Sequence, residues 1–287
     1  MRWTSCPTPI RRKPDVTRAH SLRRTAAAAP HVVWSVLFIV APLLFVLYYA
    51  FTDKDGAFSF TNILDLFTAD YLTIFLRSLC FAVIATFLCL LIAYPLALCI
   101  SRMKKHTQGI LILLVMLPMW MNLLIRTYCW MNLLETNGLI NTLLGTELTM
   151  LGTSGAVILG MVYNFLPYMV LPICTVMQKI DPSLLEAAGD LGCNGLVAVG
   201  KVVLPLSLPG VISGVTMVFV PSISTFYISQ KMGGGSFDLI GDTIERQFMA
   251  NTNYNMGAAL SLVLMVLVLL SMAVMNRFGD EEGGIVV

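Results

Sequence analysis

Charged residues are scarce in this 287-residue chain: they make up 12% of the sequence, while hydrophobic residues make up 57%. A soluble domain usually carries about a quarter charged residues. The charges that are present gather between long apolar runs, each close to the roughly 20 residues with which a helix crosses a bilayer. This composition excludes an ordinary soluble domain and predicts a polytopic membrane protein. The net charge of +2 is too small to indicate a nucleic-acid partner.

No C-x-x-C pair occurs among the seven cysteines, and five of the seven lie in apolar runs or at their ends. Cysteine behaves there as a small buried apolar side chain. We therefore predict neither a disulfide framework nor a metal site. No other feature of the sequence calls for a cofactor.

None of the apolar segments contains an Asp or Glu. The one charged residue well inside a segment is Arg126. Transporters driven by a proton gradient place Asp, Glu or His within their spans, because buried ionisable groups are costly and are retained for function. An ion-coupled secondary transporter therefore has little support from this sequence.

A complete nucleotide-binding loop is also missing. The stretch Gly195-x4-Gly200-Lys201 fits most of a P-loop, but Val202 stands where a Ser or Thr must bind Mg²⁺. No predicted strand precedes it. We predict that the chain is not an enzyme and that any ATP hydrolysis belongs to a separate subunit.

A second resemblance to a catalytic motif also lacks an essential part. Gly152-Thr153-Ser154-Gly155 matches the G-x-S-G of intramembrane serine proteases, whose serine needs a base within hydrogen-bond reach. Ser154 begins a span from the predicted outer side. The three histidines all lie on the predicted cytoplasmic side: His20, His31 and His106. The protease hypothesis therefore fails on topology.

Six apolar segments predict an all-α membrane protein with six transmembrane helices. They cover residues 32–51, 77–101, 109–130, 154–177, 203–229 and 257–276. Prolines interrupt the fourth and fifth segments, which is tolerated where neighbouring groups satisfy the freed carbonyls. We expect a disordered basic tail over 1–31, one permease domain over 32–276 and a C-terminal tail over 277–287.

Lys and Arg residues in the short loops predict the orientation, because they favour the cytoplasmic side. Seven lie before the first segment, and three follow the second: Arg102, Lys104 and Lys105. The loops after the first and third segments are mainly acidic and include Glu135. We expect a multi-pass protein of the inner or plasma membrane, in contact with lipid, with both termini in the cytoplasm.

One cytoplasmic loop, residues 181–205, has a distinctive start. Asp181-Pro182 is a strong helix start, because the carboxylate caps free N–H groups and proline fits the first turn. An apolar face follows, and Gly192 allows a tight reversal. That face consists of Leu184, Leu185, Ala188 and Leu191. Such a helix could be a lever that docks on a soluble partner, or a loop that lies on its own protein.

The same loop contains Glu186-Ala187-Ala188-x3-Gly192-x9-Val202-x-Leu204-Pro205. It resembles the EAA loop of ABC importer permeases, E-A-A-x3-G-x9-I-x-L-P, and departs from it only at Val202. The resemblance implies that residues 182–200, between the fourth and fifth spans, form the coupling helix that docks on the ATPase subunit. The residues assigned to this role are Leu184, Leu185, Glu186, Ala187, Ala188, Leu191 and Gly192.

The likeness covers roughly residues 70–276, and several stretches resemble permeases of spermidine/putrescine importers, specifically those of the PotB type. It is carried by Leu117-Pro118-Met119-Trp120, Arg126-Thr127-Tyr128-Cys129-Trp130, Asn137-Gly138-Leu139-Ile140-Asn141, Tyr163-Asn164-Phe165-Leu166-Pro167-Tyr168 and Phe226-Tyr227-Ile228-Ser229. The resemblance implies two ATPase subunits, a second permease subunit of a different sequence and an extracytoplasmic binding protein. Permeases for thiamine or ferric iron share some of these stretches, so they stay as alternatives.

A path for a flexible polycation needs carboxylates at its entrance and aromatic faces inside, because cation–π contacts replace lost hydration. Aromatic side chains at span ends are also common as interfacial anchors. The candidate path residues are Tyr128, Trp130, Tyr163, Asn164, Tyr168, Phe226, Tyr227, Asp238, Asp242 and Glu245.

Overall fold

The computed structural model describes residues 30–53, 56–146 and 148–283, which fall into two units divided after Tyr48. In the first unit the chain is helical from residue 30, with a π-helical turn η1 (Val36–Val40) leading into α2 (Ala41–Ala50). The predicted first span is thus a helix over Pro30–Ala50. Residues 1–29 of the predicted basic tail lie outside the described part of the chain.

The second unit is built from helices, and its described residues contain only one isolated β-bridge, between Thr52 and Phe58. Its elements are α3 (Thr61–Asp65), α4 (Ala69–Ser101), α5 (Lys105–Met116), η2 (Leu117–Trp120), α6 (Leu123–Leu134), α7 (Leu139–Leu144), α8 (Ser154–Met177), α9 (Pro182–Asp190), α10 (Gly195–Ala198), η3 (Val199–Val203), α11 (Leu204–Ile223), α12 (Tyr227–Met232), α13 (Ile240–Met249) and α14 (Tyr254–Gly283). The predicted all-α class is confirmed.

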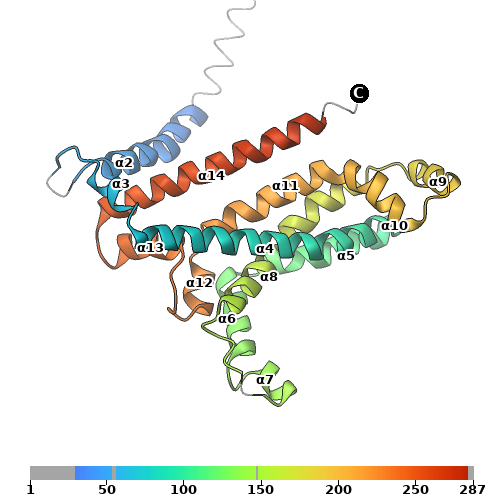
Figure 1. Cartoon of the computed structure of the whole chain (residues 1–287), viewed down its shortest axis with the longest axis horizontal. Helices are drawn as coiled ribbons and strands as arrows, with labels where there is room; N and C mark the ends of the chain where they lie inside the picture. Colours follow the sequence, from blue (N-terminus) through green and yellow to red (C-terminus); the bar gives the residue numbers. More distant parts are fainter. Residues whose placement is uncertain (1–29, 54–55, 147, 284–287) are drawn as a thin grey trace, which may run out of the picture. The chain divides into compact units, whose positions relative to one another are not determined.

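Helices α4, α8 and α11 form the core of this unit and lie side by side (Figure 1). The face of α4 that is buried carries small residues three or four positions apart: Ala82, Ala85, Cys89, Ala93 and Ala97. Small residues let helix backbones approach closely where lipid provides no hydrophobic drive to associate. On α11, a Cβ at Gly214 would lie 3.1 Å from the Met169 carbonyl oxygen of α8. Close backbone packing therefore holds the bundle together.

The third apolar segment is a broken helix rather than a straight one. Its two halves, Lys105–Trp120 and Leu123–Leu143, are bent by 92°. Pro118 lies in a 3-10 turn, Met121 is extended, and the Asn122 side chain accepts a hydrogen bond of 2.8 Å from the Leu124 N–H. Proline removes a helix donor and asparagine caps a new helix start, so the bend follows from these residues.

The fifth segment differs from the predicted 203–229 at both ends. The helix begins at Gly195, ends at Ile223, and is followed by non-helical residues before α12. Pro221 lies within its last turn, and Ser224 and Phe226 have left helical geometry. The sixth helix also continues beyond the prediction: α14 extends to Gly283, so residues 277–283 of the expected tail are helical.

Candidate coupling helix and substrate path

The loop after α8 folds as the sequence predicts. Asp181 accepts a hydrogen bond of 3.0 Å from the Ser183 N–H at the start of α9, and this bond lowers the pKa of the Asp181 carboxyl. At the other end, Gly192 has a φ of +81°. The N–H groups of Gly192 and Cys193 bond to the carbonyls of Gly189 and Ala188, as in a Schellman motif. A defined cap therefore closes each end of the helix.

The apolar residues of α9 point in two directions. Ala188 is buried and Leu185 half-buried, so these two pack against the chain's own bundle. Leu184 is exposed, Leu191 is 85% exposed, and Leu196, at the start of α10, is 87% exposed. This exposed apolar tip lies at one end of the bundle, opposite the end that carries α12 and α13 (Figure 1).

Glu186, the first residue of the EAA-like motif, is exposed and lies on a different part of α9 from the tip. It lines a groove of about 610 Å³ together with Arg102 and Lys105, which follow α4. Ala187 is exposed as well. The seven residues assigned to coupling therefore share one short helix and its cap, but they do not share one surface.

The aromatic path candidates fall into pairs at the junction of α6, α8 and α12. Trp130 of α6 and Tyr163 of α8 make an edge-to-face contact, with ring centroids 5.2 Å apart. Tyr227 of α12 lies near Tyr128 of α6. Tyr168 lies elsewhere on α8, against Phe165, and is 40% exposed. The structure thus places four of the five tyrosine and tryptophan candidates in two pairs, Trp130 with Tyr163 and Tyr128 with Tyr227.

Two polar residues at this junction have unusual surroundings. Asn164 is buried and its amide donates a 2.8 Å hydrogen bond to the Gly160 carbonyl, but its Oδ1 atom has no partner within the described residues. Lys231 of α12 lies over the ring of Tyr128, with Nζ 6.0 Å from the centroid. Lys231 was missed by sequence reasoning, because only the break after α11 brings α12 against α6.

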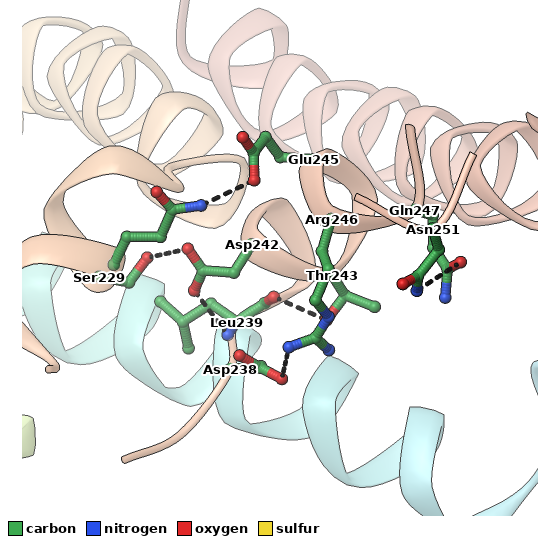
Figure 2. Close-up of polar contacts among 10 residues, drawn as sticks. Ser229, Asp238, Leu239, Asp242, Thr243, Glu245, Arg246, Gln247 and Asn251 are labelled. Carbon is green, nitrogen blue, oxygen red and sulfur yellow. Dashed lines mark hydrogen bonds and ion pairs between the residues drawn. The ribbon is translucent and has the colours of Figure 1, made fainter. Parts of the chain in front are cut away.

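The three acidic candidates lie in or beside α13 and have different partners (Figure 2). Asp238 forms an ion pair of 2.7 Å with Arg246. Asp242 accepts a 2.9 Å hydrogen bond from the Leu239 N–H and lies 2.9 Å from the Ser229 hydroxyl. Glu245 accepts a 2.8 Å hydrogen bond from the Gln230 amide. The protein's own groups thus neutralise Asp238 and enclose Asp242.

Asp242 is 4% exposed, and burial of this kind penalises the charged carboxylate. The Ser229 hydroxyl also donates a 2.8 Å hydrogen bond to the Phe226 carbonyl. The Ser229 hydroxyl therefore shares its one hydrogen between the Asp242 carboxylate and the Phe226 carbonyl. Burial, reinforced by Asp238, raises the pKa of Asp242 to about 6, although hydrogen bonds from Leu239 and Ser229 and the charge of Arg246 lower it.

We expect Asp242→Asn to remove a pH dependence of stability. The folded protein holds the Asp242 proton more tightly than an unfolded chain, whose carboxyl has a pKa of about 4. This stabilisation is complete below about pH 4 and is lost as the pH rises through about 6. Asparagine resembles the protonated acid, because its carbonyl accepts from Leu239 and its amide donates to Ser229.

The check is a pair of thermal unfolding series in detergent, from pH 5 to pH 7.5. The difference in unfolding midpoint between Asp242→Asn and the unsubstituted protein should move in favour of the variant as the pH rises. Asp242→Ala is the control, because it loses both hydrogen bonds and should be less stable throughout. A constant difference between the asparagine variant and the parent protein would contradict the raised pKa of Asp242.

The bundle of long apolar helices with a short capped helix at one end matches chains of solved ABC transporters in fold. The chain superimposes with a TM-score of 0.75 and 18% identity on a chain of a bacterial ABC transporter involved in the import of the acidic polysaccharide alginate, covering 93% of this chain and 97% of that one. A chain of the MetNI methionine ABC transporter gives a TM-score of 0.54 at 17% identity, and the match covers 75% of this chain and 99% of that one.

Sequence comparison identifies the family. The chain belongs to the binding-protein-dependent transport system inner membrane component family, whose model matches residues 24–280. It is 38% identical over 256 residues to the spermidine/putrescine transport system permease protein PotB of Haemophilus influenzae, covering 85% of this chain and 90% of the relative. The PotB of Escherichia coli is 36% identical over 258 residues, covering 86% and 94%. The chain is therefore a multi-pass membrane permease.

Proposed function

We propose that this chain is a transmembrane subunit of an ATP-driven importer that carries spermidine or putrescine. The observation that supports this most strongly is the identity of 38% and 36% to two polyamine permeases along nearly their whole length. A bound hydrocarbon chain with cationic groups also suits a path that contains both aromatic faces and a carboxylate. Other small cargoes, such as thiamine or ferric iron, are the competing assignments within the same class.

The proposed mechanism gives each end of the bundle a different partner. An ATPase subunit contacts the α9 tip, where Leu191 and Leu196 expose apolar surface that the described chain does not cover. A binding protein releases substrate at the opposite end, beside α12 and α13. Both termini then lie in the cytoplasm, and a second permease subunit completes the path. The chain itself breaks no bond, and ATP hydrolysis takes place in the two ATPase subunits.

ATP can drive such transport only if the ATPase binds α9 differently in two states of the permease. The caps at both ends of α9 support this role. A helix capped at Asp181 and Gly192 resists unwinding, so its displacement is transmitted to α8 and α11. Residues 181–205 are therefore proposed as the coupling segment within the permease domain.

The proposal is tested by uptake of radiolabelled spermidine in cells that lack their own polyamine importers. Cells expressing this chain with its partner subunits should accumulate spermidine, and unlabelled putrescine should compete. Excess thiamine or ferric iron should have no effect. Accumulation of thiamine or iron in place of polyamine would retain the permease and reject the cargo.

We expect Tyr227→Ala to raise the KM for spermidine uptake several-fold, because a tyrosine face contributes about 0.5–2 kcal/mol to a bound cation. Tyr227→Phe retains the ring and should stay near the parent value. The matched control is Tyr254→Ala, which removes an exposed tyrosine whose ring contacts among the described residues are Tyr49 and Phe248 and none of the path candidates. Unchanged kinetics in Tyr227→Ala, with normal assembly, would remove this residue from the path.

A further inference from the structure

A largely open cavity of about 420 Å³, the Glu245 cavity, lies between α11, α13 and α14. Aliphatic side chains form most of its wall, including Val220 and Leu264. The polar groups are few: the hydroxyls of Ser224 and Ser261 and the carboxylate of Glu245, which is the one charged side chain among the lining residues. The cavity is thus an apolar space with a single negative group.

The charge of Glu245 is not neutralised by the described part of the chain. Its one hydrogen-bond partner is the neutral amide of Gln230. Arg246, the neighbouring cation, is paired with Asp238 at 2.7 Å, and Lys231 lies over Tyr128. Figure 2 shows Glu245 directed away from the Asp238–Arg246 pair. Of the three acidic path candidates, Glu245 alone combines an unneutralised charge with access to a cavity.

Two further features favour a cation in this cavity. Helix α11 ends at Ile223, and its next residue, Ser224, lines the wall. The C-terminus of a helix carries a partial charge of roughly −0.5, and interrupted helices in transporters use such ends to hold cations. Phe226 also lines the cavity and is 44% exposed. An aromatic ring can attract an ammonium group through the negative charge of its face.

The walls restrict the kind of cation. A hydrated inorganic ion gains little from aliphatic surface, whereas each methylene of an alkyl chain gains about 0.8 kcal/mol on burial. An anion would be repelled by Glu245 and by the end of α11. The chemistry fits a primary ammonium group joined to an unbranched hydrocarbon chain.

We infer, on the basis of the proposed function, that this cavity is the subsite for one aminoalkyl end of the polyamine, with Glu245 as the counter-ion. Gln230 holds the carboxylate in place from α12. The same helix carries Tyr227 and Lys231 toward the aromatic pairs on α6 and α8. Because Lys231 already lies over Tyr128, the Glu245 cavity is the more favourable site for the first ammonium group.

The test uses the complete transporter in proteoliposomes, with labelled spermidine at a range of concentrations. Glu245→Gln retains the shape of the side chain and a hydrogen-bonding partner for Gln230 but removes the charge. Its KM should rise about tenfold, which corresponds to about 1.4 kcal/mol. Glu135→Gln is the matched control, because Glu135 is an exposed glutamate that does not line the cavity. Ser261→Leu, which fills the cavity without changing its charge, should also raise the KM.

The outcomes distinguish a wrong cargo from a wrong cavity assignment. If the unsubstituted transporter takes up no spermidine but takes up another solute, the proposed cargo is wrong. If the unsubstituted transporter takes up spermidine, the KM of the two variants decides. A KM equal to that of the parent in both Glu245→Gln and Ser261→Leu overturns the cavity assignment and leaves the proposed function standing. If Glu245→Gln does not assemble, an unchanged KM in Ser261→Leu is sufficient to overturn the assignment.

Discussion

Gly192→Asp should reduce substrate uptake at least tenfold while leaving the membrane-embedded bundle folded. Gly192 has a φ of +81°, and a Cβ there meets nothing within 4 Å in this chain. The backbone strain costs about 1–2 kcal/mol for a residue with a side chain. The larger effect comes from the neighbouring tip, where Leu191 is 85% exposed. A carboxylate buried against an apolar docking surface costs several kcal/mol unless it is paired.

Two measurements check this expectation: recovery of the ATPase subunit with a tagged permease, and uptake of labelled substrate. Gly192→Asn is the control, since asparagine tolerates the left-handed conformation and carries no charge. It should retain most of both signals. Normal ATPase recovery and normal uptake in Gly192→Asp would exclude this end of α9 from coupling.

Gly241→Val should prevent stable assembly of the transporter. A Cβ at Gly241 would lie 2.6 Å from the Thr225 carbonyl oxygen and 2.8 Å from that of Ser224. Both oxygens belong to backbone at the break between α11 and α12, so no side-chain rotation can relieve the overlap. Overpacking of this kind typically costs about 1–3 kcal/mol, and valine adds two methyl groups to the clash. Movement of the backbone to relieve this overlap would also distort the wall of the Glu245 cavity, which Gly241 and Ser224 line.

The expected result is a large loss of purified complex and a lower unfolding midpoint for what remains. Gly109→Val provides the comparison, because a Cβ at Gly109 on α5 meets nothing within 4 Å. That variant should purify normally. Equal yield and midpoint in both variants would show that the break after α11 moves more freely than the close contact at Gly241 indicates.

Local signals in the sequence were sufficient for much of the fold. Asp181-Pro182 and Gly192 predicted both ends of α9, because capping depends on a few adjacent residues. Long apolar runs predicted the spans. The positions at which two spans break were harder to predict from the sequence. Although Pro221 lies in the fifth apolar segment, we expected the helix to continue to residue 229, whereas it ends at Ile223.

The candidate site was predicted only in part, because its partners are far apart in the sequence. Nothing local indicates that Asp238 pairs with Arg246, that Asp242 contacts Ser229, or that Glu245 has only the neutral Gln230. The periodicity of α9 likewise places its leucines on one face, but only packing decides that Leu185 is covered and Leu191 is not. The cytoplasmic orientation, the domain limits and the roles of the coupling and path residues stay predictions.

The central claim is that this permease couples polyamine import to ATP hydrolysis by a partner. The most direct test is the rate of ATP hydrolysis by the complete complex in proteoliposomes, with the binding protein present and with or without spermidine. We predict that spermidine or putrescine raises the rate of ATP hydrolysis and that thiamine does not. An assembled, ATP-hydrolysing complex that polyamines fail to stimulate, while another solute does, would contradict it.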